Sequence, residues 1–287
     1  MTCLAILLVS LVPVHTVQSA GSDEIPDRPA DTNQSSNDLY PLEESETSYR
    51  NSHSGDRFWH HTSVRLPDLR TLPPEDLKIV ELYAEGRQLR LSNTIWNSGA
   101  GPLELAGELD QESRRTIVRQ HIYTDSDKSY IHPVGEFVWH PTHDHWHFED
   151  FTVYELWSLT PNGEREALVS SSDKLSYCVI DTDPIDQRHP AFVPRRRYGG
   201  CGQRLQGLSA GWGDTYQSHL DGQSIDISQV ADGIYALVSR TNPEEIVVEA
   251  NPYNNSAVVY IEIKGNSISR IEPQELSEEF CRLNGRC

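Results

Sequence analysis

Four histidines lie close together in the stretch that runs from residue 137 to residue 151. His143, His145 and His147 occupy every second position, and His140 lies three residues before them. Side chains at alternate positions of a β-strand share one face, so a strand here would place three imidazoles where one metal ion could bind them. Neutral imidazole binds zinc, copper, iron and nickel, and the spacing does not choose among these metals. A row of surface histidines or a structural zinc site is the plainer alternative.

Part of this spacing also occurs in other metalloproteins. His143, His145 and Glu149 match the His-x-His-x3-Glu spacing of cupin-type enzymes, but the glycines expected at fixed distances and a second segment with Gly, His and Asn do not follow. A zinc hydrolase with the pattern His-x-His-x-Asp-His is excluded because position 147 is His and not Asp. A secreted β-sandwich that uses the histidines only for metal capture or adhesion is a further alternative, without enzymatic activity.

The net charge limits which kinds of partner the protein could bind. The formal charge of the 287 residues is −19 at pH 7, which would repel the phosphates of nucleic acid and argues against that partner. The same charge is compatible with cationic partners, and simple solubility would also account for it. Hydrophobic residues make up 37% of the chain, which is enough for the core of one folded unit.

Composition divides the chain into four segments. Residues 1–20 contain an apolar run followed by small residues, which is typical of a secretory signal peptide, although the usual basic residues before the run are missing. The run is too short to span a membrane, so we expect no membrane insertion of the mature chain, and a secreted, extracellular location, or a periplasmic one in a Gram-negative bacterium. The other segments are a disordered acidic linker or propeptide, 21–57, a folded domain, 58–270, and a short acidic tail, 271–287.

The folded segment reads as a series of short strands. Apolar runs alternate with Gly, Pro and Asn turn signals, and no 3.6-residue periodicity is sustained. These features predict an all-β fold, an antiparallel β-sandwich with long irregular loops and few short helices. The strands are expected at 78–83, 88–96, 102–105, 116–123, the histidine stretch continuing through 151–157, 167–169, 174–180, 224–227, 234–239, 245–249 and 257–263.

The cysteines agree with export. Cys3 would leave with the signal peptide, and the four that remain form an even set without the CxxC spacing of a zinc knuckle or a redox pair. In an oxidising compartment the pairing that closes the shortest loops is Cys178 with Cys201 and Cys281 with Cys287.

Five strings of residues occur in an order that resembles the catalytic domain of lysyl oxidase, the copper-dependent amine oxidase. The resemblance covers most of the folded segment, from Leu66 to Glu262. The strings are Leu66-Pro-Asp-Leu69, Trp139-His-Pro-Thr-His-Asp-His-Trp-His147, Lys174-Leu-Ser-Tyr-Cys178, Gly207-Leu-Ser-Ala-Gly-Trp-Gly-Asp-Thr-Tyr216 and Ile225-Asp-Ile-Ser-Gln-Val-Ala-Asp-Gly-Ile-Tyr235.

The resemblance implies specific roles for the matching residues. It identifies three copper(II) ligands, which are His143, His145 and His147, with His140 as a further histidine before them. Lys174 and Tyr216 match the two residues that form the lysine tyrosylquinone cofactor of the family. Thr142 stands where the animal enzymes have a Cys, which indicates a branch distant from them with fewer disulfides.

The resemblance also implies an activity. The family oxidises primary amines, including peptidyl lysine in proteins, to aldehydes, uses dioxygen and releases ammonia and hydrogen peroxide. Asp214 is the carboxylate nearest to Tyr216 in the sequence and is a candidate for the general base that this reaction needs. The alternative for Asp214 is an aspartate that caps a turn or ends a strand.

Overall fold

The computed structural model describes residues 64–125, 129–160 and 162–276. The signal peptide predicted over 1–20, the linker over 21–57 and the Cys281–Cys287 pair lie outside the described residues. The four-segment division therefore stays a prediction. Among the described residues, no helix is long and apolar enough to cross a membrane.

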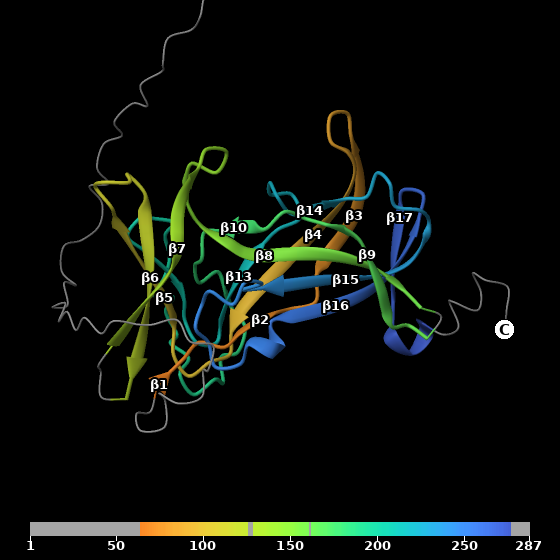
Figure 1. Cartoon of the computed structure of the whole chain (residues 1–287). Helices are drawn as coiled ribbons and strands as arrows, with labels where there is room; N and C mark the ends of the chain where they lie inside the picture. The colour runs from red at the N-terminus through yellow and green to blue at the C-terminus, as the bar shows by residue number, and fades with distance from the viewer. Residues whose placement is uncertain (1–63, 126–128, 161, 277–287) are drawn as a thin grey trace, which may run out of the picture. The chain divides into compact units, whose positions relative to one another are not determined.

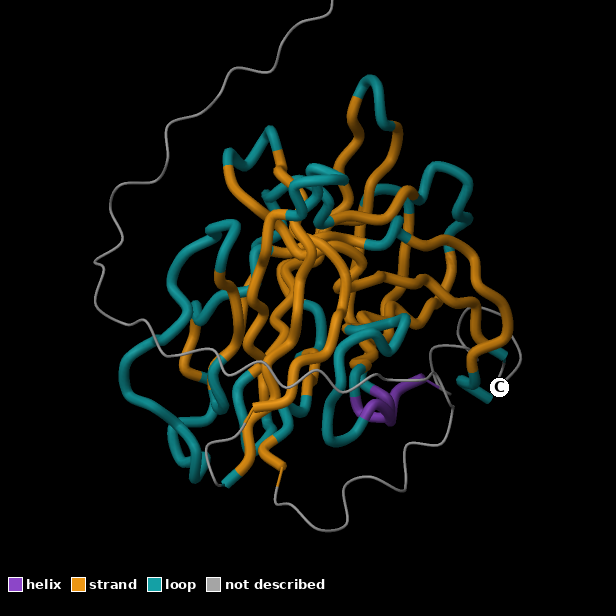
Figure 2. The backbone as a smooth tube through the Cα atoms, turned by 60° about the vertical axis from the view of Figure 1, so that its left-hand side comes forward, coloured by secondary structure: helices purple, strands orange, loops and turns teal. Residues whose placement is uncertain are grey.

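The prediction of an all-β fold is confirmed, since strands dominate the described chain and helix is limited to two short 3-10 segments (Figure 2). The elements are β1 (Val64–Arg65), β2 (Leu69–Thr71), β3 (Glu75–Leu82), β4 (Gly86–Asn97), β5 (Leu103–Leu109), β6 (Thr116–Thr124), β7 (Ser129–His140), β8 (His145–Leu159), β9 (Arg165–Ser171), β10 (Leu175–Tyr177), β11 (Asp183–Pro184), β12 (Leu205–Leu208), β13 (Trp212–Tyr216), β14 (Ser224–Asp226), β15 (Gly233–Thr241), η1 (Pro252–Asn254), β16 (Ser256–Lys264), β17 (Ser267–Ile271) and η2 (Pro273–Glu275).

The strands form two antiparallel sheets (Figure 1). The larger sheet has the order β12-β5-β6-β7-β8-β15-β16-β17, with β1 added to β6 and with β9 and β10 added to β8. The smaller sheet has the order β11-β13-β4-β14, with β2 and β3 added to β4. The long strand β8 therefore lies at the centre of the larger sheet, and β4 holds the smaller one together.

The core lies where the two sheets meet. Leu89 and Leu91 of β4 pack in one apolar cluster with Leu156 of β8 and Leu237 of β15, and all four are fully buried. Alternate residues of a strand face opposite sides, which is why β4 and β8 can each supply side chains to this interior every second position. A second cluster extends the core toward the histidines and includes Tyr216.

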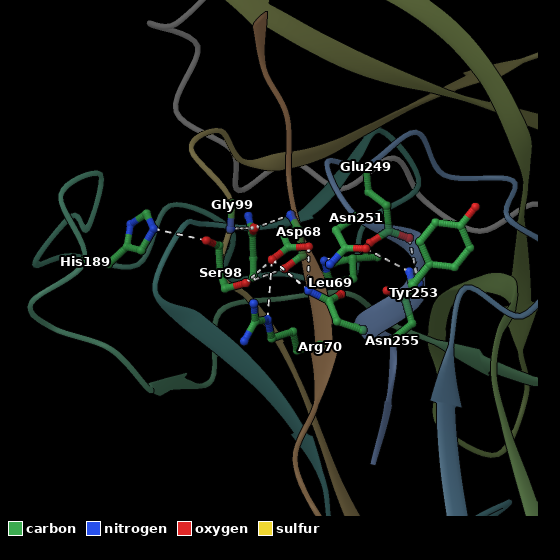
Figure 3. A network of polar contacts seen from close by, with 12 residues as sticks. Asp68, Leu69, Arg70, Ser98, Gly99, His189, Glu249, Asn251, Tyr253 and Asn255 are labelled. Carbon is green, nitrogen blue, oxygen red and sulfur yellow. Dashed lines mark hydrogen bonds and ion pairs between the residues drawn. The ribbon is translucent and has the colours of Figure 1, made fainter. Parts of the chain in front are cut away.

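The strand predicted at 245–249 is wrong. Asn242 and Glu245 adopt positive φ values of 47° and 54°, outside the usual β region, and no residue from 245 to 249 pairs in a sheet. Polar side chains replace the ladder in this segment: the Asn242 amide oxygen accepts from the Val247 amide, and the Glu249 carboxylate accepts from the Leu69 amide at 2.9 Å. Figure 3 shows Glu249 in one network of polar contacts with Leu69 and Asp68. The apolar residues of this segment predicted a strand and did not indicate that network.

Candidate metal and quinone site

The histidine stretch forms a hairpin and not one continuous strand. β7 ends at His140, four turn residues follow, and β8 begins at His145. His140 and His145 are cross-strand partners, and the amides of His143 and Asp144 both donate to the His140 carbonyl. The expectation that one strand would place His143 on the same face as the later histidines is therefore wrong, because the chain reverses in between.

The hairpin nevertheless brings the imidazoles together. The ring centroids of His140 lie 4.3 Å from those of His143 and 4.5 Å from those of His147, and His143 Nδ1 lies 3.2 Å from His147 Nε2. One nitrogen from each of these three rings lies within 4.8 Å of the others, a separation that suits ligands of one metal ion. His145 lies beside this group, with ring centroids 4.9 Å from those of His147.

His145 has a second set of neighbours. Its ring nitrogen lies within 4.8 Å of the sulfurs of Cys178 and Cys201, which are joined in a disulfide. The disulfide confirms the pairing predicted for these two cysteines, and a disulfide sulfur is not the thiolate that binds metals strongly. The four imidazoles are thus the candidate ligands, and His140 is as close to the group as the three histidines that the sequence pattern favoured.

His147 is the most constrained of the four. Its side chain is 1% exposed, and Nδ1 lies 3.0 Å from the Ser176 hydroxyl. Burial lowers the pKa of His147 to about 3, with the neighbouring histidines contributing in the same direction. The imidazole is therefore neutral at physiological pH, as a metal ligand must be, and the contact with Ser176 fixes the orientation of the ring.

Tyr216 lies next to His147 in the interior. It ends β13, is 7% exposed, and its ring stands edge-on to that of His147 with centroids 6.2 Å apart. The Cys178 amide donates to the Tyr216 hydroxyl at 2.7 Å. Burial is the main cause that raises the pKa of Tyr216 well above its ordinary value, and the Asp214 carboxylate acts in the same direction. The structure thus brings the predicted quinone precursor and the imidazoles together.

A set of polar residues that the sequence did not single out surrounds Tyr216. Tyr177 packs against the ring of Tyr216. The Tyr177 hydroxyl forms hydrogen bonds with the Tyr154 hydroxyl, with the side-chain amide group of Asn93 and with the side-chain amide oxygen of Gln223. These residues come from β4, β8, β10 and the segment before β14. The only local signal was the aromatic residue inside the string Lys-x-Ser-aromatic-Cys, since partners this far apart in sequence leave no pattern.

Asp214 lies two residues before Tyr216 on the same strand. It is 1% exposed, and its Oδ2 atom has no hydrogen-bond partner among the described residues. Burial is the main cause that raises the pKa of Asp214 well above its ordinary value, assisted by the charges of Asp181 and Asp183. A general base must be ionised, whereas this environment favours the protonated carboxyl, so the role of Asp214 as a base stays a prediction.

Lys174 occupies a different environment. Its ammonium group lies 2.9 Å from the carboxylate of Glu244, and both side chains are about half exposed, at 44% and 50%. The hydrogen bond that Lys174 donates to the Glu244 carboxylate is the main cause that raises the pKa of Lys174. Among the described residues, no hydrogen bond or ion pair joins Lys174 to Tyr216. Cys178 lies four positions after Lys174. A chain spans at most about 3.6 Å per residue, so the two Cα atoms lie within roughly 14 Å of each other.

Comparison with known proteins identifies the family. The family model for lysyl oxidase matches residues 108–272, which is more than half of the chain and includes every predicted site residue. The chain belongs to the lysyl oxidase family.

Three relatives of this lysyl oxidase family member show the extent of the similarity. Protein-lysine 6-oxidase of Sus scrofa is 36% identical over 133 residues, which are 46% of this chain and 48% of the relative. The protein-lysine 6-oxidase of Homo sapiens is 36% identical over 124 residues, 43% of this chain and 27% of the relative. Lysyl oxidase homolog 4 of Homo sapiens is 33% identical over 174 residues, 60% of this chain and 18% of the relative. The matched region spans about half or less of the length of these relatives.

Proposed function

We propose that this protein is a secreted copper-dependent amine oxidase that converts primary amines, chiefly peptidyl lysine in proteins, to aldehydes and releases ammonia and hydrogen peroxide. One observation carries the proposal. Tyr216, which matches the tyrosine that becomes the quinone in the family, is buried, and its ring is edge-on to that of His147. His147 is one of four imidazoles that lie close together.

The imidazole cluster fits copper. Neutral imidazoles are good ligands for copper(II), and the two sulfurs beside His145 are held in a disulfide, so neither offers a thiolate that would compete for the ion. His143, His145 and His147 are the ligands that we propose from the resemblance, and the structure groups His140, His143 and His147 most closely, with His145 beside them. Bound copper, together with dioxygen, would supply the oxidation that converts Tyr216 to a quinone.

The cofactor also requires Lys174. To join Tyr216, the ε-amine of Lys174 must leave Glu244, lose its proton and enter the interior. The pairing with Glu244 favours the charged ammonium, so the arrangement described here corresponds to a protein in which the two residues are still separate. The strand β10 follows Lys174 directly, and the segment that must move is therefore short.

The proposed proton acceptor is Asp214. Its carboxyl lies on the same face of β13 as Tyr216, two residues away, and has one oxygen without a partner among the described residues. Its burial excludes bulk water from the proton transfer. The net charge of −19 would attract lysine-rich, cationic substrates to the protein.

A mass-spectrometric experiment tests the proposal. Full-length protein is prepared without metal, divided, and exposed to air with and without copper, and tryptic peptides are then analysed without chemical reduction of the quinone. The copper-treated half should contain a cross-linked peptide with both Lys174 and Tyr216, and should release hydrogen peroxide when a lysine-containing peptide is added. Unmodified Tyr216 in copper-loaded protein would instead support the alternatives without oxidase activity, a cupin-like metal site or an adhesin-like β-sandwich.

A further inference from the structure

The closest aromatic neighbour of Tyr216 is Tyr177, the residue just before Cys178. The two ring centroids lie 4.0 Å apart with an angle of 34° between the planes, so the rings pack closely in a tilted arrangement, whereas the ring of His147 is edge-on to Tyr216. Tyr177 is fully buried and Tyr216 is 7% exposed. No solvent therefore separates the two rings.

The hydroxyl of Tyr177 is fixed from several sides. It lies 2.6 Å from the Tyr154 hydroxyl, accepts from the Asn93 amide at 3.2 Å, and lies 3.4 Å from the amide oxygen of Gln223. The Tyr154 hydroxyl in turn donates to Gln223 at 2.6 Å. Asn93, Tyr154 and Gln223 are all nearly fully buried, so this network holds the plane of the Tyr177 ring in place.

The same surroundings keep Tyr177 a neutral phenol. Its hydroxyl partners are amides and another phenol, none of which is a base, and burial raises the pKa of Tyr177 to about 12. A neutral phenol is an electron-rich ring, whereas a quinone is an electron-poor one. Two such rings in van der Waals contact attract each other. An electron-rich ring in contact with an electron-poor one also absorbs light by charge transfer from the first to the second.

We propose that Tyr177 is a positioning residue for the cofactor, whose buried phenol holds the ring of Tyr216 in close, tilted contact and forms a charge-transfer pair with it after oxidation. The inference rests on the proposed function, since it requires that Tyr216 becomes a quinone. No net electron transfer to or from Tyr177 is involved, and Tyr177 does not touch the substrate. Its contribution is the orientation of the ring and the position of the visible absorption band.

The test compares visible spectra of copper-loaded, air-exposed full-length protein with those of two variants. Tyr177→Phe keeps a ring against Tyr216 but makes it a poorer electron donor. Tyr154→Phe is the matched control, because it removes one hydroxyl from the same buried network and leaves both contacting rings unchanged. The amount of quinone in each sample is measured separately from the yield of the cross-linked peptide, and copper content and circular dichroism confirm that each variant is folded and loaded.

The expected result is a shift of the visible band to shorter wavelength in Tyr177→Phe, with the band of Tyr154→Phe at the wild-type wavelength. Equal shifts in both variants, or an unshifted band in Tyr177→Phe with quinone present, would overturn the inference and leave the proposed function standing. A lower quinone yield in Tyr177→Phe with an unshifted band would show that Tyr177 is only a packing residue. Absence of quinone from the wild-type protein would reject the proposed function and this inference with it.

If Tyr177→Phe does not fold, Tyr177→Trp provides the second measurement. Indole is a better electron donor than phenol, so the band should then move to longer wavelength. A band at or below the wild-type wavelength in that variant would also overturn the inference.

Discussion

Tyr216 and Lys174, the two residues predicted to form the cofactor, lie in opposite kinds of environment. Tyr216 is buried, its hydroxyl accepts from a main-chain amide, and aromatic rings contact it on two sides. Lys174 is half exposed and is held by one ion pair with Glu244. The fold therefore brings Tyr216 and the imidazoles together and leaves Lys174 outside this group. If the proposed cofactor forms, Lys174 must move into place.

The largest effect is expected from a ligand in the buried half. His147→Ala removes the most buried imidazole of the cluster, so the variant should lose most of its copper and all oxidase activity. Elemental analysis and a peroxide assay measure the two losses. His189→Ala is the control, because His189 lies in the loop after β11 and bonds to the Ser98 carbonyl, outside the cluster. Full copper content in His147→Ala, and likewise in the corresponding variants of His143 and His145, would remove the metal assignment.

Two variants separate the halves of the cofactor. Tyr216→Phe should retain copper, form no quinone and lose stability, because the buried Cys178 amide is left without its acceptor at a cost of about 1–3 kcal/mol. Lys174→Ala should also retain copper and fail to form the mature cofactor, yet leave the midpoint of denaturant unfolding unchanged, because its ion pair is exposed. Unfolding curves of the two variants test the contrast directly. Equal losses of stability would contradict it.

The disulfide should stabilise the buried half. Cys178 and Cys201 are separated by 23 residues, and opening a loop of that size is expected to cost roughly 2–4 kcal/mol of unfolding free energy. The amide that bonds Tyr216 belongs to Cys178, and the Cys201 carbonyl accepts from the Trp146 amide of the histidine hairpin. The double variant with Ala at both cysteines should therefore form quinone more slowly at equal copper content. An unchanged rate would show that the strands alone hold Tyr216.

Asp214 provides a test of pH dependence. Its pKa is raised in the folded protein, so its favourable contribution to stability is fully present below the ordinary carboxyl pKa and is lost as the pH rises through the raised value. Asp214→Asn should remove this loss, and the unfolding free energy of the variant should decline less with rising pH than that of wild type. If Asp214 is the general base, turnover in wild type should rise with pH over the same interval, since only the ionised carboxylate accepts a proton. Turnover that persists in Asp214→Asn, with full quinone content, would assign the base elsewhere.

The sequence predicted local features of the site better than its assembly. The alternate spacing of His143, His145 and His147 predicted a metal-binding segment, but the turn before His145 changed which faces the imidazoles share. The proximity of Tyr216 to His147 could not be read from spacing, because it depends on which strands of the two sheets meet. Resemblance placed both residues in one site, and the ring contact agrees with it.

The difference between local pattern and tertiary contacts also explains which strands were predicted correctly. Runs with alternating apolar residues, such as 88–96 and 257–263, were predicted as strands and lie within β4 and β16, because a sheet buries one of their faces. The segment 245–249 has a similar apolar content, but the Val248 amide and carbonyl both bond to the side chain of Gln120 on β6, 128 residues away. Distant polar contacts of this kind override local pattern, and no window of sequence contains them.

The smallest expected effect concerns the exposed half. Glu244→Gln removes the charge that holds the Lys174 ammonium, which should free the lysine and favour its neutral form. Quinone should therefore appear faster after copper is added to metal-free protein in air, but by no more than roughly fivefold, because exposed ion pairs are weak and salt screens them. Glu245→Gln is the matched control, since it makes the same change of charge one residue away at an exposed position that forms no ion pair among the described residues. High salt should accelerate wild type toward the rate of Glu244→Gln and leave that variant unchanged. Equal rates for wild type and both variants at low salt would show that release of Lys174 from Glu244 is not the slow step, and that the barrier lies in bringing the lysine into the interior.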